Sequence, residues 1–199
     1  TALGNPSFPI QRGITLPNHP MHVHNDGRLY FGDYDNLSVT DTTRGKGLIH
    51  YVQTKYGTED GSANDGSTYN ALDLPYGYAP TDIESWGSDL VIAAIPISDD
   101  TTFSHGKARL FFWDTVSASP YRSVELPDPV CTALLNQNGN LYIWSGNMNN
   151  GVRVSVYAGG YSIKELAFFE EGFSPPAGAV DGLGNRVAWG AFTTFPENS

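Results

Sequence analysis

Three histidines near the start of the chain have the clearest capacity for chemistry. His19, His22 and His24 lie close together, and Asp26 follows them. Alternate side chains of a β-strand point to the same face, so a strand through this segment would place the His22 and His24 imidazoles on one side. Imidazole and carboxylate groups are ligands for zinc and similar ions. The pattern predicts either a metal site at His22, His24 and Asp26 or polar side chains that line a channel and make turn contacts.

A loop at residues 57–68 offers a second set of possible ligands. It is rich in Gly, Ser, Asn and Asp and places oxygen atoms at alternate positions. A calcium loop uses such oxygens, but it also needs a glycine directly after the third ligand and a closing glutamate. Asp65 occupies the glycine position and no closing glutamate follows. The loop therefore predicts either a calcium site with an imperfect motif or a solvated segment.

Two loops are candidates for contact with a ligand or partner, because binding residues are often carried on loops above a rigid scaffold. The first is 57–68, and the second is 98–107. The side chains expected to make these contacts are Asp60, Ser62, Asn64, Asp65, Asp99, Asp100 and His105.

The sequence contains few residues in the arrangements that enzymes use. A glycoside hydrolase needs two carboxyl groups that flank the scissile bond, and Asp82, Glu84 and Asp181 are the acids near predicted inner strands. Their mutual geometry is not fixed by the sequence. The chain contains no serine nucleophile elbow, phosphate loop or metalloprotease helix motif, and its single cysteine, Cys131, is expected to be a buried apolar residue. We therefore predict a protein that is not an enzyme and needs no cofactor beyond the calcium or zinc considered above.

Composition indicates the fold class and the kinds of partner. The chain has 199 residues, 22 glycines and 13 prolines, which is typical of an all-β protein with many turns. Its net charge is -10, with only 11 lysines and arginines, and nucleic-acid binding requires clustered basic residues. The sequence therefore predicts no nucleic-acid partner. No apolar run approaches twenty residues, so it also predicts no membrane span.

A repeat gives the most information about architecture. A tight turn that contains a glycine leads directly into an apolar strand four times, at intervals of 60, 52 and 45 residues; the turn glycines are Gly27, Gly87, Gly139 and Gly184. Four-stranded propeller blades repeat about every 40–50 residues. A Leu-Pro pair that ends a strand recurs upstream of three turns, at Leu16-Pro17, Leu74-Pro75 and Leu126-Pro127. Both markers predict a β-propeller of four-stranded antiparallel blades.

The predicted blades are out of phase with the ends of the sequence. An outer strand at 8–17 precedes a blade at 18–75, and blades at 76–127 and 128–176 are followed by a partial blade at 177–199. About four blade equivalents result. The first strand could complete the last blade and close the ring, which removes the exposed sheet edges. Alternatively, the chain could form a segment of a larger ring.

Four phrases carry a family resemblance. They are Leu72-Asp73-Leu74-Pro75, Ile83-Glu84-Ser85-Trp86-Gly87, the segment 108–114 and the segment 178–186. With the repeat, they make the whole chain resemble β-propeller proteins carried by tailed phages and uncultivated viruses.

The resemblance implies a virion or extracellular location and a non-enzymatic structural role in a phage tail or capsid-associated position. The implied partners are other virion or assembly subunits, and a receptor or glycan on the host surface for attachment. The alternative is a glycan-binding or glycan-processing propeller, which means a lectin or a glycoside hydrolase.

Overall fold

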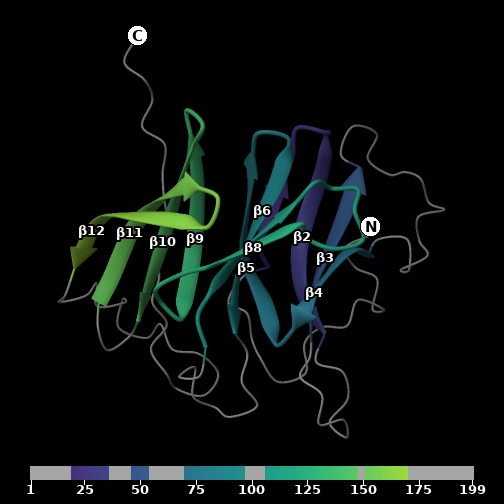
Figure 1. Ribbon diagram of the computed structural model, residues 1–199. Coiled ribbons are helices and arrows are strands. Elements are labelled where there is room, and N and C mark those ends of the chain that lie inside the picture. Colours follow the sequence, from purple (N-terminus) through teal and green to yellow (C-terminus); the bar gives the residue numbers. More distant parts are fainter. Residues whose placement is uncertain (1–18, 36–45, 54–69, 97–105, 148–150, 170–199) are drawn as a thin grey trace, which may run out of the picture.

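The computed structural model describes residues 19–35, 46–53, 70–96, 106–147 and 151–169 (Figure 1). Within these ranges the chain forms twelve β-strands and no helix, so the predicted all-β class is confirmed. No helix in the described ranges is long and apolar enough to cross a membrane.

The twelve strands form three four-stranded sheets, and every sheet is antiparallel with its strands in chain order. The first sheet contains β1 (Met21–Val23), β2 (Arg28–Asp35), β3 (Lys46–Gln53) and β4 (Asn70–Tyr76). The second contains β5 (Tyr78–Trp86), β6 (Asp89–Pro96), β7 (Arg109–Trp113) and β8 (Arg122–Glu125). The third contains β9 (Val130–Gln137), β10 (Asn140–Asn147), β11 (Gly151–Gly159) and β12 (Ser162–Phe169). The predicted outer strand at 8–17 and partial blade at 177–199 lie outside the described residues.

The repeated glycine turns join the first two strands of each sheet. Gly27, Gly87 and Gly139 have φ angles of 83°, 65° and 81°, which glycine adopts at little cost because it has no Cβ atom. In the third sheet Asn138 also has a positive φ, of 52°. An Asn-Gly pair with two positive φ angles is the favoured connection of a tight hairpin. The turn chemistry in the sequence thus determines where each hairpin reverses.

The second sheet is buried on both faces, and β6 shows why its sequence is apolar throughout. Leu90, Ile92 and Ala94 belong to the core cluster shared with the first sheet. Their neighbours Val91, Ala93 and Ile95 belong to the cluster shared with the third sheet. Because side chains alternate across a strand, an uninterrupted apolar run is what a strand between two other sheets requires. Figure 1 shows the second sheet between the other two.

The first and second sheets approach closely at two glycines. A Cβ atom on Gly47 would lie 2.7 Å from Pro80 Cδ and 2.8 Å from the Tyr78 carbonyl oxygen. A Cβ atom on Gly32 would lie 2.7 Å from Pro20 Cγ and 2.8 Å from Pro80 Cγ. No side chain larger than hydrogen fits at such separations unless its neighbours move, so these glycines set the spacing between β5 and the first sheet.

Candidate functional site

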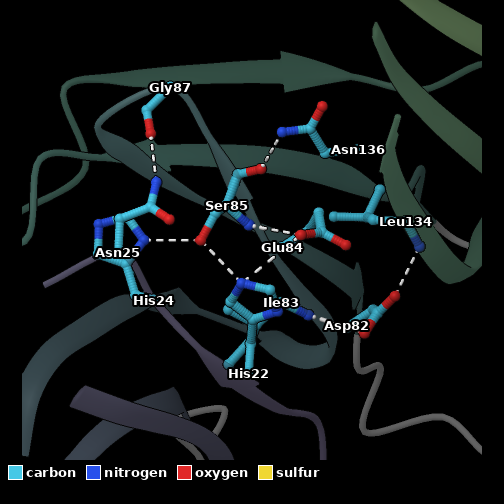
Figure 2. Close-up of polar contacts among 10 residues, drawn as sticks. All are labelled: His22, His24, Asn25, Asp82, Ile83, Glu84, Ser85, Gly87, Leu134 and Asn136. Atoms are coloured by element: carbon cyan, nitrogen blue, oxygen red, sulfur yellow. Dashed lines mark hydrogen bonds and ion pairs between the residues drawn. The ribbon is translucent and has the colours of Figure 1, made fainter. Parts of the chain in front are cut away.

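β5 packs across the first sheet, where it contacts β1, β2 and β3, and it packs against β9 of the third sheet. A set of hydrogen bonds between the sheets lies on β1, β5 and β9 and in the turns that follow them. We call the polar contacts among these three strands and their turns the inner seam. Its centre is Ser85 on β5. The Ser85 Oγ lies 2.7 Å from His22 Nε2 and 2.7 Å from His24 Nδ1, and Figure 2 shows both imidazoles directed at this hydroxyl. His22 lies on β1 and His24 directly follows this strand, and both imidazoles reach the same hydroxyl of β5.

The proton of the Ser85 hydroxyl constrains both imidazoles. A hydroxyl group donates one hydrogen bond and accepts others, while a neutral imidazole has one N–H and one bare nitrogen. The hydroxyl can therefore donate to one histidine while it accepts an N–H from the other. Ser85 is only 8% exposed and His24 only 5%, so water has little access to replace either bond. The hydroxyl ties the tautomers of His22 and His24 to each other.

Glu84 is the charged neighbour of this pair. Its Oε1 accepts a hydrogen bond of 2.9 Å from the Ser85 backbone N–H and lies 3.5 Å from His22 Nε2. Burial is the main cause that lowers the pKa of His22, and the nearby His24 lowers it further, while the Glu84 carboxylate acts in the opposite direction. His22 is therefore neutral at pH 7, because its pKa lies below the ordinary value of about 6.5.

Asp26 does not join the two histidines. One of its carboxylate oxygens accepts a 2.9 Å hydrogen bond from the Arg28 N–H, and the other accepts a 2.7 Å bond from the Tyr30 hydroxyl. The Arg28 guanidinium lies 3.6 Å away. Burial is the largest of the causes that raise the pKa of Tyr30 to about 12, so Tyr30 remains a donor to this carboxylate.

Asp82 connects β5 to β9. Its two oxygens accept hydrogen bonds from the Ile83 N–H at 2.9 Å and from the Leu134 N–H at 2.6 Å. Burial raises the pKa of Asp82 to about 6; the two N–H donors oppose this shift and the Glu84 charge adds to it. A carboxylate held by two amides within the protein is well suited to joining strands.

Four further hydrogen bonds continue the seam, and each joins a side chain of one sheet to a backbone carbonyl of a neighbouring sheet. Their lengths run from 2.6 to 3.0 Å. The pairs are Asn25 Nδ2 with the Gly87 carbonyl, Thr81 Oγ1 with Cys131, Trp86 Nε1 with Gly139 and Asn136 Nδ2 with Ser85. The bonds from Thr81 and Asn136 are partly buried, so they satisfy backbone carbonyls that have limited access to water, while the other two lie at the surface.

The arrangement does not match a nucleophilic serine site. In a catalytic triad the base contacts serine through one ring nitrogen, and a carboxylate orients it through the other. Here His22 Nε2 contacts both Ser85 and Glu84. The only cysteine, Cys131, is buried, and burial raises its pKa far above the ordinary value for a thiol. Within the described ranges the seam is built to hold sheets together.

The predicted metal ligands occupy the places just described, with His22 and His24 at Ser85 and Asp26 at Tyr30. In the part of the chain that the structure describes, no three or more His, Cys, Asp or Glu side chains form a group that could hold a metal ion. The predicted loop residues Asp60, Ser62, Asn64, Asp65, Asp99, Asp100 and His105 lie outside the described ranges, as does Asp181.

Ser85 could not be identified as the centre of the seam from the sequence. Ser85 belongs to no catalytic or ligand-binding motif. Its role depends on the packing of β1 against β5, which brings His22 and His24 to Ser85 from 63 and 61 positions away in the sequence. Asn136 was missed for the same reason. No family profile, curated protein or solved structure matches this chain.

Proposed function

We propose that this chain is a non-enzymatic β-propeller module in which successive four-stranded sheets stand around a common axis. The proposal extends to its role, which is that of a virion component contacting other subunits or a host receptor. The chain contributes three described sheets, and the predicted fourth unit supplies the next.

The observation that carries the propeller is the order of contacts between sheets. β5 packs across β1, β2 and β3 of the first sheet and against β9 of the third, and each sheet keeps its four strands in chain order. The same four-stranded antiparallel meander recurs three times in chain order, which is the way blades are arranged in a propeller. A two-sheet sandwich does not account for three stacked sheets whose middle member is buried on both faces.

Binding, and not catalysis, fits the state of the polar groups. Asp82, Glu84 and Ser85 each make hydrogen bonds within the inner seam. A catalytic acid or nucleophile must reach its substrate in a plausible pose. These groups instead fix the distance between neighbouring sheets, which supports a rigid scaffold that presents its loops to a partner.

The geometry of the ring is tested by cryo-electron microscopy of the purified protein. We expect a radial set of sheets in which β1, β5 and β9 lie nearest the axis and β4, β8 and β12 lie at the rim. A reconstruction without a common axis, or with β4, β8 and β12 innermost, would overturn the propeller.

The virion role needs a separate test. Antibodies raised against the purified chain should label virus particles in material that contains its gene, as seen by immunogold electron microscopy. The control is pre-immune serum. Label confined to the particle-free fraction would contradict a virion role and would leave the ring geometry unaffected.

A further inference from the structure

A groove lies between the second and third sheets, outside the inner seam. Its volume is about 460 Å³, which lies within the usual range for small-molecule sites. The second sheet and the segment after it contribute Lys107, Glu125 and Pro127. The third sheet contributes Arg153 and Ser155 from β11, Glu165 from β12 and Tyr161 from the turn between them.

The charges around the groove balance, although the whole chain is strongly acidic. On the second sheet, Glu125 accepts a 2.8 Å bond from Arg109 Nη2 and lies 3.8 Å from Lys107 Nζ. On the third sheet, Arg153 Nε lies 3.0 Å from Asp128 Oδ2, and its Nη1 pairs with Glu165. Among the residues that line the groove, two cations, Lys107 and Arg153, balance two carboxylates, Glu125 and Glu165. The groove therefore favours a neutral ligand over a strongly charged one.

Both kinds of hydrogen-bonding group are exposed at the groove. The Lys107, Glu125 and Glu165 side chains are 53%, 50% and 47% exposed. Ammonium groups only donate hydrogen bonds, and ionised carboxylates only accept them. A ligand that uses both at once must itself donate and accept at neighbouring positions, as the hydroxyl groups of a sugar do.

Ser155 gives an independent sign of a ligand. It is 1% exposed and lines the groove, and its hydroxyl has no hydrogen-bond partner among the residues that the structure describes. A buried hydroxyl without a partner is costly, and most such groups in proteins are satisfied by a protein group, a water molecule or a ligand. On β11, Ser155 stands opposite Glu165 of β12 in the strand register, close to the charged pairs.

Tyr161 supplies an aromatic surface at the rim. It is 77% exposed, and it follows Gly159 and Gly160, which have φ angles of 94° and 61°. The Gly160 carbonyl accepts a 2.9 Å hydrogen bond from the Tyr157 hydroxyl, which in turn accepts a 2.7 Å bond from Arg122. The turn is thus braced against the second sheet. An aromatic ring held in this way can pack against the apolar C–H face of a pyranose.

We propose that the groove lined by Tyr161, Ser155, Glu165, Arg153, Glu125 and Lys107 binds a neutral saccharide. The sugar ring would cover Tyr161, while its hydroxyls donate to Glu125 and Glu165 and accept from Lys107. The groove lies between two described sheets whether or not the sheets close into a ring. The saccharide proposal can therefore fail while the ring stands, and the ring can fail while the saccharide site stands.

Saturation-transfer NMR with the full chain tests the ligand class. The neutral probes are cellobiose, lactose and N,N′-diacetylchitobiose, and the acidic probe is 3′-sialyllactose. We expect saturation transfer to at least one neutral disaccharide and weaker transfer to the acidic one. Transfer to none of the neutral probes, or only to 3′-sialyllactose, would overturn the proposal.

Variants then locate the site. Tyr161→Ala should weaken the affinity for the bound disaccharide about tenfold, as expected for loss of an aromatic anchor. Tyr76→Ala is the matched control, because Tyr76 is also exposed, at 62%, but lies on β4. It should leave the affinity unchanged within about twofold. Equal affinities for wild type and Tyr161→Ala would place the sugar elsewhere and reject this groove.

Discussion

At the scale of single residues, a few buried polar groups connect the sheets. Ser85 serves two histidines with one hydroxyl, and Asp82 holds the backbone of β9. Ser155, by contrast, has no described partner. Because an unsatisfied buried group costs more than a satisfied one contributes, substitutions at these positions should have opposite consequences.

Ser85→Ala should lower the free energy of unfolding by about 1–3 kcal/mol, because both imidazole nitrogens lose their partner in a poorly hydrated site. Urea denaturation followed by tryptophan fluorescence measures the change. Ser119→Ala is the control, since Ser119 is exposed and its replacement should change the value by less than about 0.5 kcal/mol. Equal effects of the two substitutions would contradict a central role for Ser85.

Two buried serines of the third sheet form a second comparison. Ser145 is 2% exposed and donates a 2.7 Å hydrogen bond to Asp128, whereas Ser155 is 1% exposed and has no described partner. Ser145→Ala should destabilise the protein by about 1–2 kcal/mol, and Ser155→Ala should be neutral or slightly stabilising without ligand. Thermal unfolding by circular dichroism ranks the two variants. A larger loss for Ser155→Ala would show that its hydroxyl is already bonded.

The pH dependence of stability should report on Asp82. Its folded pKa is about 6, above the ordinary value of about 3.9 for an unfolded chain. A raised folded pKa means that the folded protein binds the proton more tightly, so the stabilising contribution is present below about pH 4 and is lost as the pH rises through about 6. The size of this contribution is about 3 kcal/mol.

Asp82→Asn removes this titration while the amide oxygen can still accept from Leu134. The difference in unfolding free energy, variant minus wild type, should therefore rise between pH 4 and pH 7, as measured by urea denaturation at each pH. His22 acts in the opposite direction, because its lowered pKa removes stability as the pH falls, and it is common to both proteins. A difference that stays constant with pH would show that Asp82 is ionised throughout.

At the scale of elements, much of the sheet structure could be predicted and little of the seam could. The apolar run at 90–96 and the alternating segment at 122–126 correspond to β6 and β8, because burial on two faces and on one face leave different periodicities. The glycine turns indicated where the first two strands of each sheet reverse direction. Ser85 and Asn136 could not be found this way, since their partners come from other sheets and leave no local pattern.

Gly47→Ala tests the close contact between the first two sheets. The added methyl would press on Pro80 and on the Tyr78 carbonyl, and backbone atoms cannot turn away as a flexible side chain can. Overpacking of this kind costs about 1–3 kcal/mol, which should appear as a lower urea midpoint. Ala71→Gly, on neighbouring β4, controls for a general effect of Gly/Ala exchange in this sheet and should cost only about 1 kcal/mol.

At the scale of the whole molecule, the outward face of β1 carries exposed apolar residues. Met21 and Val23 are 63% and 58% exposed within the described structure, while His22 between them points to β5. In a propeller every sheet face is covered by a neighbouring blade. We therefore expect this face to be the place where the ring closes or where further chain is added.

Val23→Glu should disrupt that closure, because a carboxylate would be buried without a partner. Size-exclusion chromatography with light scattering should show a larger hydrodynamic radius or a changed mass. Val116→Glu is the matched control, since Val116 is 87% exposed and lies in the turn after β7. If both variants behave like wild type, nothing packs on the outward face of β1.

The double-sided burial of β6 also has a consequence for synthesis. When the first sheet leaves the ribosome, its apolar side chains, such as Tyr30, Ile49 and Leu72, are still exposed to water, because β6 covers them only after it has been synthesised. The other face of the second sheet is likewise exposed until the third sheet has been synthesised. Among the described sheets, the first is covered only when the second has been made, and the second only when the third has been made. Folding should therefore advance one sheet behind translation. Nascent chains released early would be the forms most exposed to chaperones and proteases.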